Sequence, residues 1–267
     1  MEKYKGAVLV TGAFGGMGSK TVTALAESGY KVYALDRCVG EGSEAVIPIR
    51  CDITDERSVE DAFLEVRRTA DDLCAIIHFA GIYMLDSLVE MDNEAFERIF
   101  KVNLQGAYLV NKIFLPLLKR PSRIIMTTSE LAPLDPLPFT GIYAVTKGAL
   151  DKYAYSLRME LQLLDIDVCV LRAGAVATEM LGVSTDHLER FCKETKLYSC
   201  NAERFKRIVD GVEARNIDPE RIAERIIWIL KKKRTVFSYS INRNPLLLML
   251  NALPKRLQLG IIKKILE

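Results

Sequence analysis

A glycine-rich turn between two apolar runs restricts this chain to a narrow set of folds. The first run, 7–10, leads into glycines at 12, 16 and 18, and a stretch with helical spacing and a second run, 32–35, follow. Glycines permit a tight turn and a close approach of the backbone to a phosphate, which the free N–H groups at a helix start can bind. This order predicts a β-α-β unit with a dinucleotide site at its first turn.

An acidic residue stands at the end of the second run. The Asp36 carboxylate can accept hydrogen bonds from both hydroxyls of a ribose, and its charge repels a 2′-phosphate. The neighbouring Arg37 offers a guanidinium that suits the same phosphate. The pair therefore favours NAD as the cofactor and leaves NADP as the alternative.

A tyrosine and a lysine near the middle of the chain have helical spacing. Tyr143 and Lys147 are four residues apart, so a helix over 143–150 presents them on one face. A cation near a phenol favours the phenolate, and we therefore expect the pKa of Tyr143 to be lowered. Ser129 precedes Tyr143 by fourteen residues and is suited to hydrogen-bond a substrate oxygen. The alternative is an ordinary surface pair on an amphipathic helix.

Together these segments resemble the short-chain dehydrogenases/reductases, and the resemblance covers nearly the whole chain. The glycine-rich turn is similar to the family's cofactor turn, and Asp52 and Ile53 resemble its strand-end element that contacts the adenine ring. Ala80 and Gly81 match the end of the stretch that passes close to the adenosine ribose. The resemblance implies a hydride-transfer enzyme that uses a nicotinamide cofactor.

The same stretch departs from the family pattern at two positions. His78 and Phe79 stand where the family has two asparagines. A histidine at the end of an apolar strand is more often a satisfied structural residue, and this is the interpretation that we favour. The alternative makes His78 a catalytic base, although Tyr143 and Lys147 already supply the proton chemistry.

The resemblance also implies a catalytic tetrad of Asn103, Ser129, Tyr143 and Lys147. Tyr143 then exchanges a proton with the substrate alcohol, while Lys147 lowers its pKa and binds the nicotinamide ribose. Ser129 holds the substrate oxygen, and Asn103, on a locally bent helix, holds a water that relays protons. Glu130 follows where small residues are more usual, and it faces either the substrate or solvent.

One further element resembles the family segment that binds the nicotinamide end of the cofactor. Val176 and Thr178 match the family residues that bind the carboxamide, although the proline that usually precedes them is missing. The complete set of predicted cofactor-binding residues is Gly12, Phe14, Gly16, Met17, Gly18, Asp36, Arg37, Asp52, Ile53, Ala80, Gly81, Tyr143, Lys147, Val176 and Thr178.

Length and composition agree with one α/β domain over residues 1–267. A hydrophobic content of 49% is ample for a doubly wound, Rossmann-type parallel sheet buried on both faces in a three-layer α/β/α arrangement. The formal charge of +2 gives no reason to expect nucleic acid as a partner. The basic run 231–234 follows a helical pattern and is interpreted as a solvated helix end, with a membrane-surface patch as the alternative.

The cysteines indicate a reducing compartment. Six cysteines form no Cys-x-x-Cys pair and mostly fall in apolar runs, so we expect buried thiols and no metal site. No signal peptide is recognisable, and no run approaches the ~20 apolar residues of a membrane-spanning helix. We expect a soluble, cytoplasmic protein.

Two segments are candidates for substrate choice. The first, 179–217, carries apolar residues spaced as a helical lid: Met180, Leu181, Leu188, Phe191, Leu197, Tyr198 and Phe205. The second is an amphipathic C-terminal extension, 242–267. We rank its possible uses as a flap on the pocket, a subunit contact and, last, a peripheral membrane contact.

These observations favour an NAD-dependent oxidoreductase that interconverts a secondary alcohol and a ketone. The apolar segments suggest a bulky apolar substrate, first of all a hydroxysteroid or bile acid. One alternative is an NADP-dependent 3-oxoacyl thioester reductase of the fatty-acid type. Another is a catalytically silent dinucleotide-binding regulator. By resemblance, the chain forms a homodimer or homotetramer.

Overall fold

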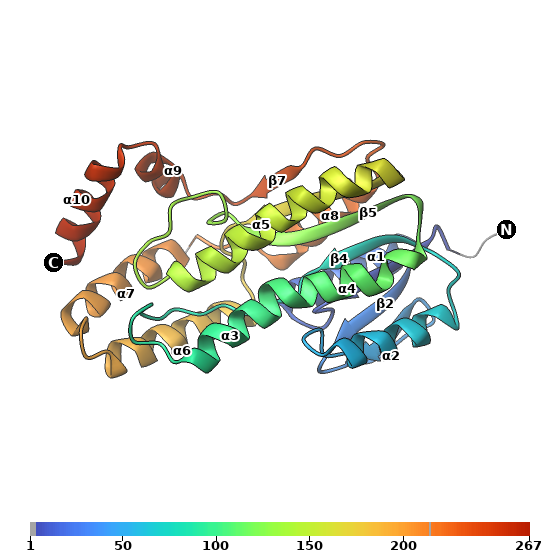
Figure 1. The fold of residues 1–267 in the computed structure, drawn as a ribbon, viewed down its shortest axis with the longest axis horizontal. Coiled ribbons are helices and arrows are strands. Elements are labelled where there is room, and N and C mark those ends of the chain that lie inside the picture. Colours follow the sequence, from blue (N-terminus) through green and yellow to red (C-terminus); the bar gives the residue numbers. More distant parts are fainter. Residues whose placement is uncertain (1–3, 214) are drawn as a thin grey trace.

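A parallel sheet runs through the centre of the computed structural model (Figure 1), which describes residues 4–213 and 215–267 and all their side chains except those of 180–186 and 210–213. In this part of the chain the sheet has seven strands in the order β3-β2-β1-β4-β5-β6-β7. The strands are β1 (Ala7–Thr11), β2 (Lys31–Asp36), β3 (Val46–Arg50), β4 (Leu73–His78), β5 (Leu118–Ser129), β6 (Ile166–Ala173) and β7 (Ser238–Ile241).

The strand order changes direction between β1 and β4. β1 pairs with β2 on one side and with β4 on the other, and every pairing in the sheet is parallel. The carboxyl ends of β1, β4, β5 and β6 therefore lie along one edge of the sheet. In open α/β sheets, ligands bind at this edge and at such a switch point.

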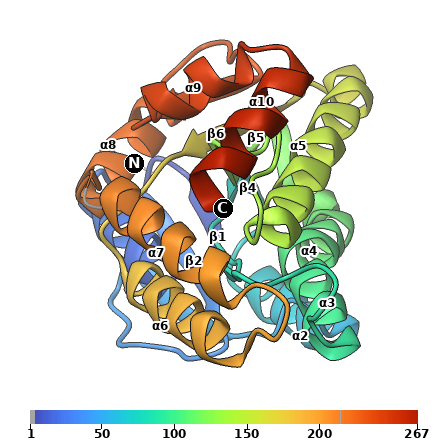
Figure 2. The same cartoon turned by 90° about the vertical axis from the view of Figure 1, so that its left-hand side faces the viewer.

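Helices cover both faces of the sheet. They are α1 (Gly16–Glu27), α2 (Glu56–Arg67), α3 (Asn93–Phe100), α4 (Gly106–Phe114), α5 (Gly141–Leu161) and α8 (Pro219–Leu230), with the short segments η1 (Lys101–Gln105), η2 (Leu115–Leu117) and η3 (Gln162–Leu164). Figure 2 shows α4 and α5 on one side of the sheet and α8 on the other. The β-branched and aliphatic strand residues are buried because both faces are covered.

The core accordingly divides into two clusters separated by the sheet. One joins strand residues such as Leu9 and Ile124 to α2, α4 and α5, and the other joins Val8 and Ile125 to α1 and α8. Neighbouring residues of one strand thus point into different clusters, as expected for a strand with helices on both sides. The predicted single Rossmann-type domain with three layers is confirmed.

Four further helices gather around the carboxyl end of the sheet. They are α6 (Glu179–Glu194), α7 (Ser199–Glu213), α9 (Pro245–Asn251) and α10 (Lys255–Leu266). Figure 1 shows α6, α7 and α10 at the end of the molecule far from the N-terminus. The predicted lid is largely helical. Of its seven apolar residues, Leu188, Phe191 and Phe205 are buried, Tyr198 is partly buried, Leu197 is exposed, and the side chains of Met180 and Leu181 lie outside the described residues.

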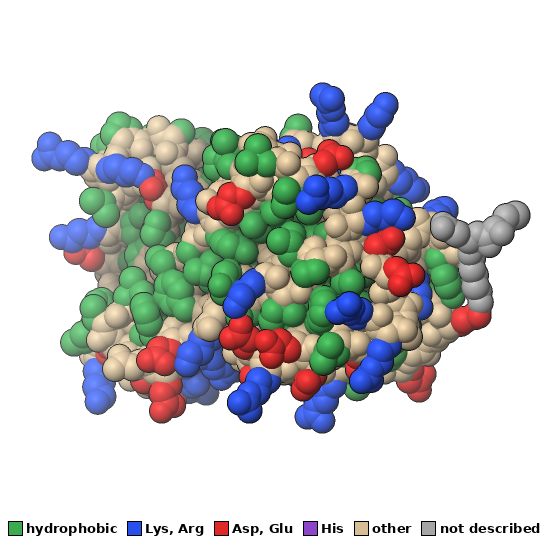
Figure 3. Space-filling model, turned by 45° about the vertical axis from the view of Figure 1, so that its right-hand side comes forward, with side chains coloured by type: hydrophobic (Ala, Val, Ile, Leu, Met, Phe, Trp, Pro, Cys, Tyr) green, Lys and Arg blue, Asp and Glu red, His purple; other side chains and the backbone are tan. Residues whose placement is uncertain are grey.

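The surface mixes both signs of charge. Figure 3 shows Lys and Arg side chains interspersed with Asp and Glu, with hydrophobic areas between them. Among residues 4–213 and 215–267, no helix combines the length and apolarity needed to cross a bilayer.

The cysteines are less uniformly buried than their sequence context suggests. All six are free thiols, and Cys51 and Cys169 lie in the core. Cys38 and Cys200 are exposed, because the first lies in the loop after β2 and the second on the outer side of α7. The expectation of buried thiols is therefore wrong for these two.

Candidate active site

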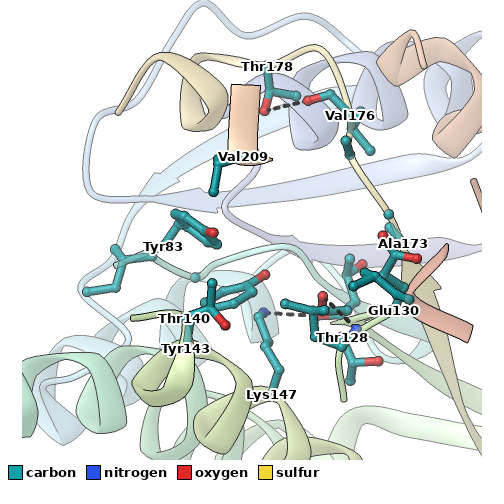
Figure 4. Close-up of a pocket in the computed structure, with 18 of the residues that line it drawn as sticks. Tyr83, Thr128, Glu130, Thr140, Tyr143, Lys147, Ala173, Val176, Thr178 and Val209 are labelled. Carbon is teal, nitrogen blue, oxygen red and sulfur yellow. Dashed lines mark hydrogen bonds between the residues drawn. The ribbon is translucent and has the colours of Figure 1, made fainter. Parts of the chain in front are cut away.

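A cavity of about 190 Å³ lies where the central strands end (Figure 4), and residues of α7 and α9 contribute to its lining. Seven of the predicted site residues line it: Met17, Gly81, Ser129, Tyr143, Lys147, Val176 and Thr178. Ile82, Tyr83 and Thr140, to which the sequence assigned no role, also line the cavity, as do Glu130 and, from the C-terminal extension, Leu247. The remaining predicted residues lie behind the cavity or at the other end of the glycine-rich turn.

The glycine-rich turn has no room for a side chain at Gly12, Gly16 or Gly18. A Cβ at Gly18 would lie 2.0 Å from the carbonyl oxygen of Gly12, and one at Gly16 would lie 2.6 Å from Cβ of Thr178. Gly12 itself has φ +65°, and its Cβ would lie 2.5 Å from the amide nitrogen of Ala80. The turn therefore brings the start of α1 against Thr178 and leaves its N–H groups accessible to an anion.

Asp36 is fixed at the end of β2 beside this turn. Its Oδ2 accepts a hydrogen bond from the Phe14 N–H at 3.0 Å, and its Oδ1 accepts one from the Cys38 N–H at 3.3 Å. The carboxylate is only partly buried, so it remains able to accept further hydrogen bonds.

A second acid marks the same end of the site. Burial acts to raise the pKa of Asp52, but hydrogen bonds from Thr54 and the charge of Arg37 lower it overall. The Thr54 N–H and hydroxyl both donate to its Oδ1, at 2.9 and 2.7 Å. Ile53 is buried and leaves room only for glycine at position 106, where a Cβ would lie 2.4 Å from its Cδ1.

Tyr143 lies on α5 and faces the cavity. Burial raises the pKa of its phenol to about 12, and hydrogen bonding with Ser129 opposes that shift. The Tyr83 ring packs edge-on against it, with 4.5 Å between the centroids. The expectation of a lowered pKa is therefore wrong for this structure, because desolvation of the phenolate dominates.

Lys147 lies one turn further along α5 and is 6% exposed. Its Nζ donates to the Thr127 carbonyl at 3.2 Å and lies 5.7 Å from the centroid of the Tyr143 ring. Burial lowers the pKa of the ammonium to about 8. A Cβ at Gly81 would lie 3.3 Å from this Nζ and 3.2 Å from Oδ1 of Asn103, so the two side chains meet at the glycine.

Asn103 occupies the middle of η1, a π-helix between α3 and α4. The wider turn is the local bend that the resemblance implied, and such insertions are frequent at functional sites. The amide accepts from the Ile82 N–H at 2.8 Å and donates to the Ile82 carbonyl at 2.9 Å and the Thr146 hydroxyl at 3.1 Å. Asn103 thereby links α5 to the segment that follows β4.

His78 belongs to the core and not to the cavity lining. Its Nε2 is 2.9 Å from Oδ1 of Asn111, and its Nδ1 is 3.5 Å from the Thr11 hydroxyl. Burial lowers its pKa to about 4, so the ring is neutral near pH 7. The geometry favours the structural interpretation of His78 over that of a catalytic base.

The loop with Val176 and Thr178 is held from two sides. Val176 forms an isolated bridge with Ile217, and Thr178 precedes the first residue of α6. Asn242 donates to the carbonyls of Ala175 and Arg215, both at 2.8 Å. The C-terminal extension therefore begins against the loop predicted to bind the nicotinamide.

Glu130 is the polar residue of the cavity that sequence reasoning left undecided. It is 7% exposed, lines the cavity and accepts a hydrogen bond from the Asn244 N–H through Oε2 at 2.6 Å. Burial raises its pKa, which the Asn244 hydrogen bond and the charge of Arg243 oppose. The only sequence signal for this arrangement was the unusual residue type at that position.

Comparison with known proteins agrees with this geometry. A sequence model described as short chain dehydrogenase matches residues 6–189. The chain is 27% identical over 246 residues to a probable short-chain type dehydrogenase/reductase, VdlC, of Helicobacter pylori, with 90% of each chain covered. It is 31% identical over 203 residues to estradiol 17-beta-dehydrogenase 2 of Mus musculus, covering 70% of this chain and 52% of the mouse protein.

Solved structures show the same fold. The 3-ketoacyl-(acyl-carrier-protein) reductase of Brucella melitensis, complexed with NADH, superimposes with a TM-score of 0.73 at 21% identity, and the match covers 90% of this chain and 98% of that one. The family match spans more than half of the sequence. The chain is therefore an oxidoreductase that belongs to the short-chain dehydrogenase family, whose members bind a nicotinamide dinucleotide.

Proposed function

We propose that this protein is an NAD-dependent dehydrogenase that interconverts a secondary alcohol and a ketone on a bulky apolar molecule. One observation carries the proposal: Ser129, Tyr143 and Lys147 converge on a single cavity that adjoins the glycine-rich turn. A cofactor bound along that turn would reach the cavity past Met17 and Thr178.

The residues of the turn fit a dinucleotide. Side chains at positions 12, 16 and 18 would collide with Ala80, Thr178 and Gly12, so the tight turn requires glycines there, and the start of α1 provides N–H groups for a pyrophosphate. The Asp36 carboxylate, placed by two backbone amides, suits a ribose with free hydroxyls and disfavours a 2′-phosphate. These features support NAD, while Arg37 keeps NADP as the alternative.

The proton chemistry follows from the neighbours of Tyr143. When bound, the nicotinamide exchanges a hydride with the substrate carbon. With a pKa of about 12, Tyr143 is protonated near pH 7 and suits proton donation to the ketone oxygen, to which Ser129 can also donate a hydrogen bond. The Lys147 ammonium stabilises the phenolate that this transfer produces. Oxidation of the alcohol uses the same groups in reverse.

The cavity walls support an apolar substrate. Ile82, Tyr83, Leu131, Leu137 and Leu247 are among the apolar residues that surround its polar groups. The 31% identity to an estradiol dehydrogenase makes a hydroxysteroid or bile acid the first substrate class to test. A 3-oxoacyl thioester reductase remains the second candidate, and it would be recognised by a preference for NADP.

The test follows NADH at 340 nm with hydroxysteroids, bile acids, simple secondary alcohols and 3-oxoacyl thioesters, each with NAD and with NADP. Turnover of one apolar alcohol class with NAD supports the proposal. Tyr143→Phe should lower kcat by about 10²–10⁴-fold, because it removes the proton donor. NADH affinity, measured by fluorescence titration, should stay within about 2-fold.

A matched control lies on the same helix. Tyr155 is exposed on α5, so Tyr155→Phe should leave kcat unchanged. The contrary outcome is that the unaltered protein binds NADH but turns over no compound of the panel. The chain is then a silent dinucleotide-binding regulator instead.

We also propose a homo-oligomer in a reducing, cytoplasmic setting. The surface of α3, η1 and α4 exposes aromatic residues, with Phe96 and Tyr108 each 45% exposed. They border a groove against α5 that suits a second copy of the chain. Light scattering after size exclusion tests the assembly. Free thiols at all six cysteines support the location.

A further inference from the structure

We propose that Glu130 binds a hydrogen-bond donor of the substrate, a hydroxyl or an ammonium group a few atoms from the carbon that reacts. The inference rests on the proposed function, because it concerns the substrate of the same cavity. It narrows the substrate class to ketones and alcohols that carry a neighbouring donor.

The first observation is the burial of a carboxylate in a cavity whose other lining residues are apolar side chains, hydroxyls and the Lys147 ammonium. Among the described residues that line the cavity, Glu130 is the only acid, and it is 7% exposed. A buried carboxylate is costly unless hydrogen bonds or an opposite charge compensate it.

The second observation concerns the two carboxylate oxygens. Oε2 accepts from the Asn244 N–H, whereas Oε1 has no hydrogen-bond donor among the described residues. Arg243 is near enough to lower the pKa of Glu130 but forms no ion pair with it in this part of the chain. Gly174, which also lines the cavity, packs beside Oε1, since a Cβ there would lie 3.1 Å from this oxygen and 1.9 Å from the Asn242 carbonyl oxygen. One oxygen is thus held, and the other is available to a ligand.

The third observation is the distance to the reacting atoms along the chain. Glu130 directly follows Ser129, so their Cα atoms are about 3.8 Å apart, and both side chains line the cavity. Figure 4 shows Glu130 beside Ala173, across the cavity from Tyr83 and Val209. A substrate oxygen bound by Ser129 and Tyr143 therefore lies in the same cavity as the Glu130 carboxylate, which substrate atoms next to the reacting carbon can reach.

This arrangement should make the enzyme discriminate between substrates that carry a hydrogen-bond donor at this position and substrates that lack one. A substrate with a donor at that position satisfies Oε1, whereas an alkyl group displaces water and leaves the charge without a partner. Sites built around a buried hydrogen bond reject analogues that lack the group far more strongly than apolar pockets reject a missing methylene. We expect a preference of at least about 100-fold in kcat/KM.

The experiment compares ketones of one carbon skeleton. Purified protein and NADH are offered a long-chain alkan-3-one, the 2-hydroxyalkan-3-one and the 2-aminoalkan-3-one of equal chain length. Both donor-bearing ketones should exceed the plain ketone by about 100-fold or more in kcat/KM. The ratio of the amino to the hydroxy compound then identifies whether charge or hydrogen bonding dominates.

Two variants separate recognition from a structural role. Glu130→Gln retains one oxygen for the Asn244 N–H and turns an NH₂ toward the cavity, so the preference should fall to about 10-fold or less. Asn244→Pro removes that N–H at a residue whose φ of −80° suits proline, and Asn244→Ala keeps the N–H while removing the side chain. Both Asn244 variants should retain the preference.

The outcomes are distinct. Equal turnover of plain and donor-bearing ketones overturns the inference and leaves the proposed function standing. A loss of preference in Asn244→Pro as large as that in Glu130→Gln also overturns it, because Glu130 then acts only as a support for the extension. No turnover of any ketone, with NADH bound, overturns both. The comparison of the three ketones needs no variant and stands even if a substitution impairs folding.

Discussion

The cofactor turn and the C-terminal extension border the same cavity but are built in opposite ways. At the turn, backbone atoms meet so closely that a Cβ at Gly18 would lie 2.0 Å from a carbonyl oxygen. In the extension, a Cβ at Gly260 of α10 would have no neighbour within 4 Å, and Leu246, Leu257 and Leu259 are more than half exposed. The cofactor side therefore tolerates almost no change, whereas the substrate side can vary without loss of the fold.

The sharpest test of this contrast exchanges one glycine in each region for alanine. Gly18→Ala should lower the free energy of unfolding by about 3 kcal/mol and weaken NADH binding at least about 100-fold, because the turn must open. Gly260→Ala lies in a helix with free space and should leave stability unchanged or raise it by up to about 1 kcal/mol. Urea unfolding and NADH titration measure both; equal effects of the two substitutions would contradict the contrast.

A second test uses pH on the buried core beneath the turn. The pKa of His78 falls from an ordinary value near 6.5 to about 4 on folding, so the unfolded chain binds more protons between these values. The stabilisation is complete above pH 6.5 and is lost as the pH falls toward 4, by about 3 kcal/mol in total.

His78→Asn removes this titration and keeps an amide beside Asn111. Its stability should depend less steeply on pH between 6.5 and 4 than that of the unaltered protein, by about the same 3 kcal/mol. Urea unfolding at several pH values provides the measurement. Parallel pH profiles for the two proteins would show that folding does not lower the pKa of His78.

A third test addresses the preference for NAD over NADP, which we assign to Asp36 beside the turn. Asp36→Ala should shift the ratio of kcat/KM for NADP over NAD at least about 10-fold toward NADP, because the charge that repels the 2′-phosphate is gone while Arg37 remains. Asp36→Asn keeps an acceptor for the Phe14 N–H and should give an intermediate ratio. An unchanged ratio in both variants would place the selectivity elsewhere.

The smallest effect is expected in the extension. Leu247 lines the cavity, and Leu247→Ala should raise the KM of an apolar substrate by about 10-fold or less, with the NADH affinity unchanged. The adjacent Leu246 is 61% exposed and does not line the cavity, so Leu246→Ala is the matched control and should alter neither. Equal shifts in KM from the two substitutions would mean that α9 moves as a whole.

Much of the fold could be predicted because local patterns repeat along the chain. Apolar runs that alternate with helical spacing define the strands, and the glycine-rich turn places the cofactor edge. The spacing of Ser129, Tyr143 and Lys147 likewise predicted their convergence. The confirmed bend at Asn103 came from family resemblance, since a π-helix has no sequence pattern of its own.

What could not be predicted depends on contacts between distant segments. The pKa of Tyr143 follows from burial by residues such as Tyr83, and sequence spacing to Lys147 contains no information on that burial. Glu130 lines the cavity, and one of its oxygens accepts a hydrogen bond from Asn244, 114 residues later in the chain. The exposure of Cys38 and Cys200 was missed because short apolar context says little about which face of a loop or helix meets solvent.

The two ends of the extension are attached to the rest of the domain in different ways. At its start, Asn242 hydrogen-bonds two carbonyls and its own carbonyl oxygen fills the space where a Cβ of Gly174 would lie. At its far end, the carbonyl of Leu266 accepts from Asn201 and Arg204 of α7, at 2.8 and 3.2 Å. Among the described residues, separation of α10 from α7 breaks these two hydrogen bonds and the packing of Leu266 and Ile262 in a small apolar cluster. Separation at Asn242 instead breaks hydrogen bonds to two backbone carbonyls beside the last strand. Displacement of α10 should therefore cost less free energy than displacement of the start of the extension.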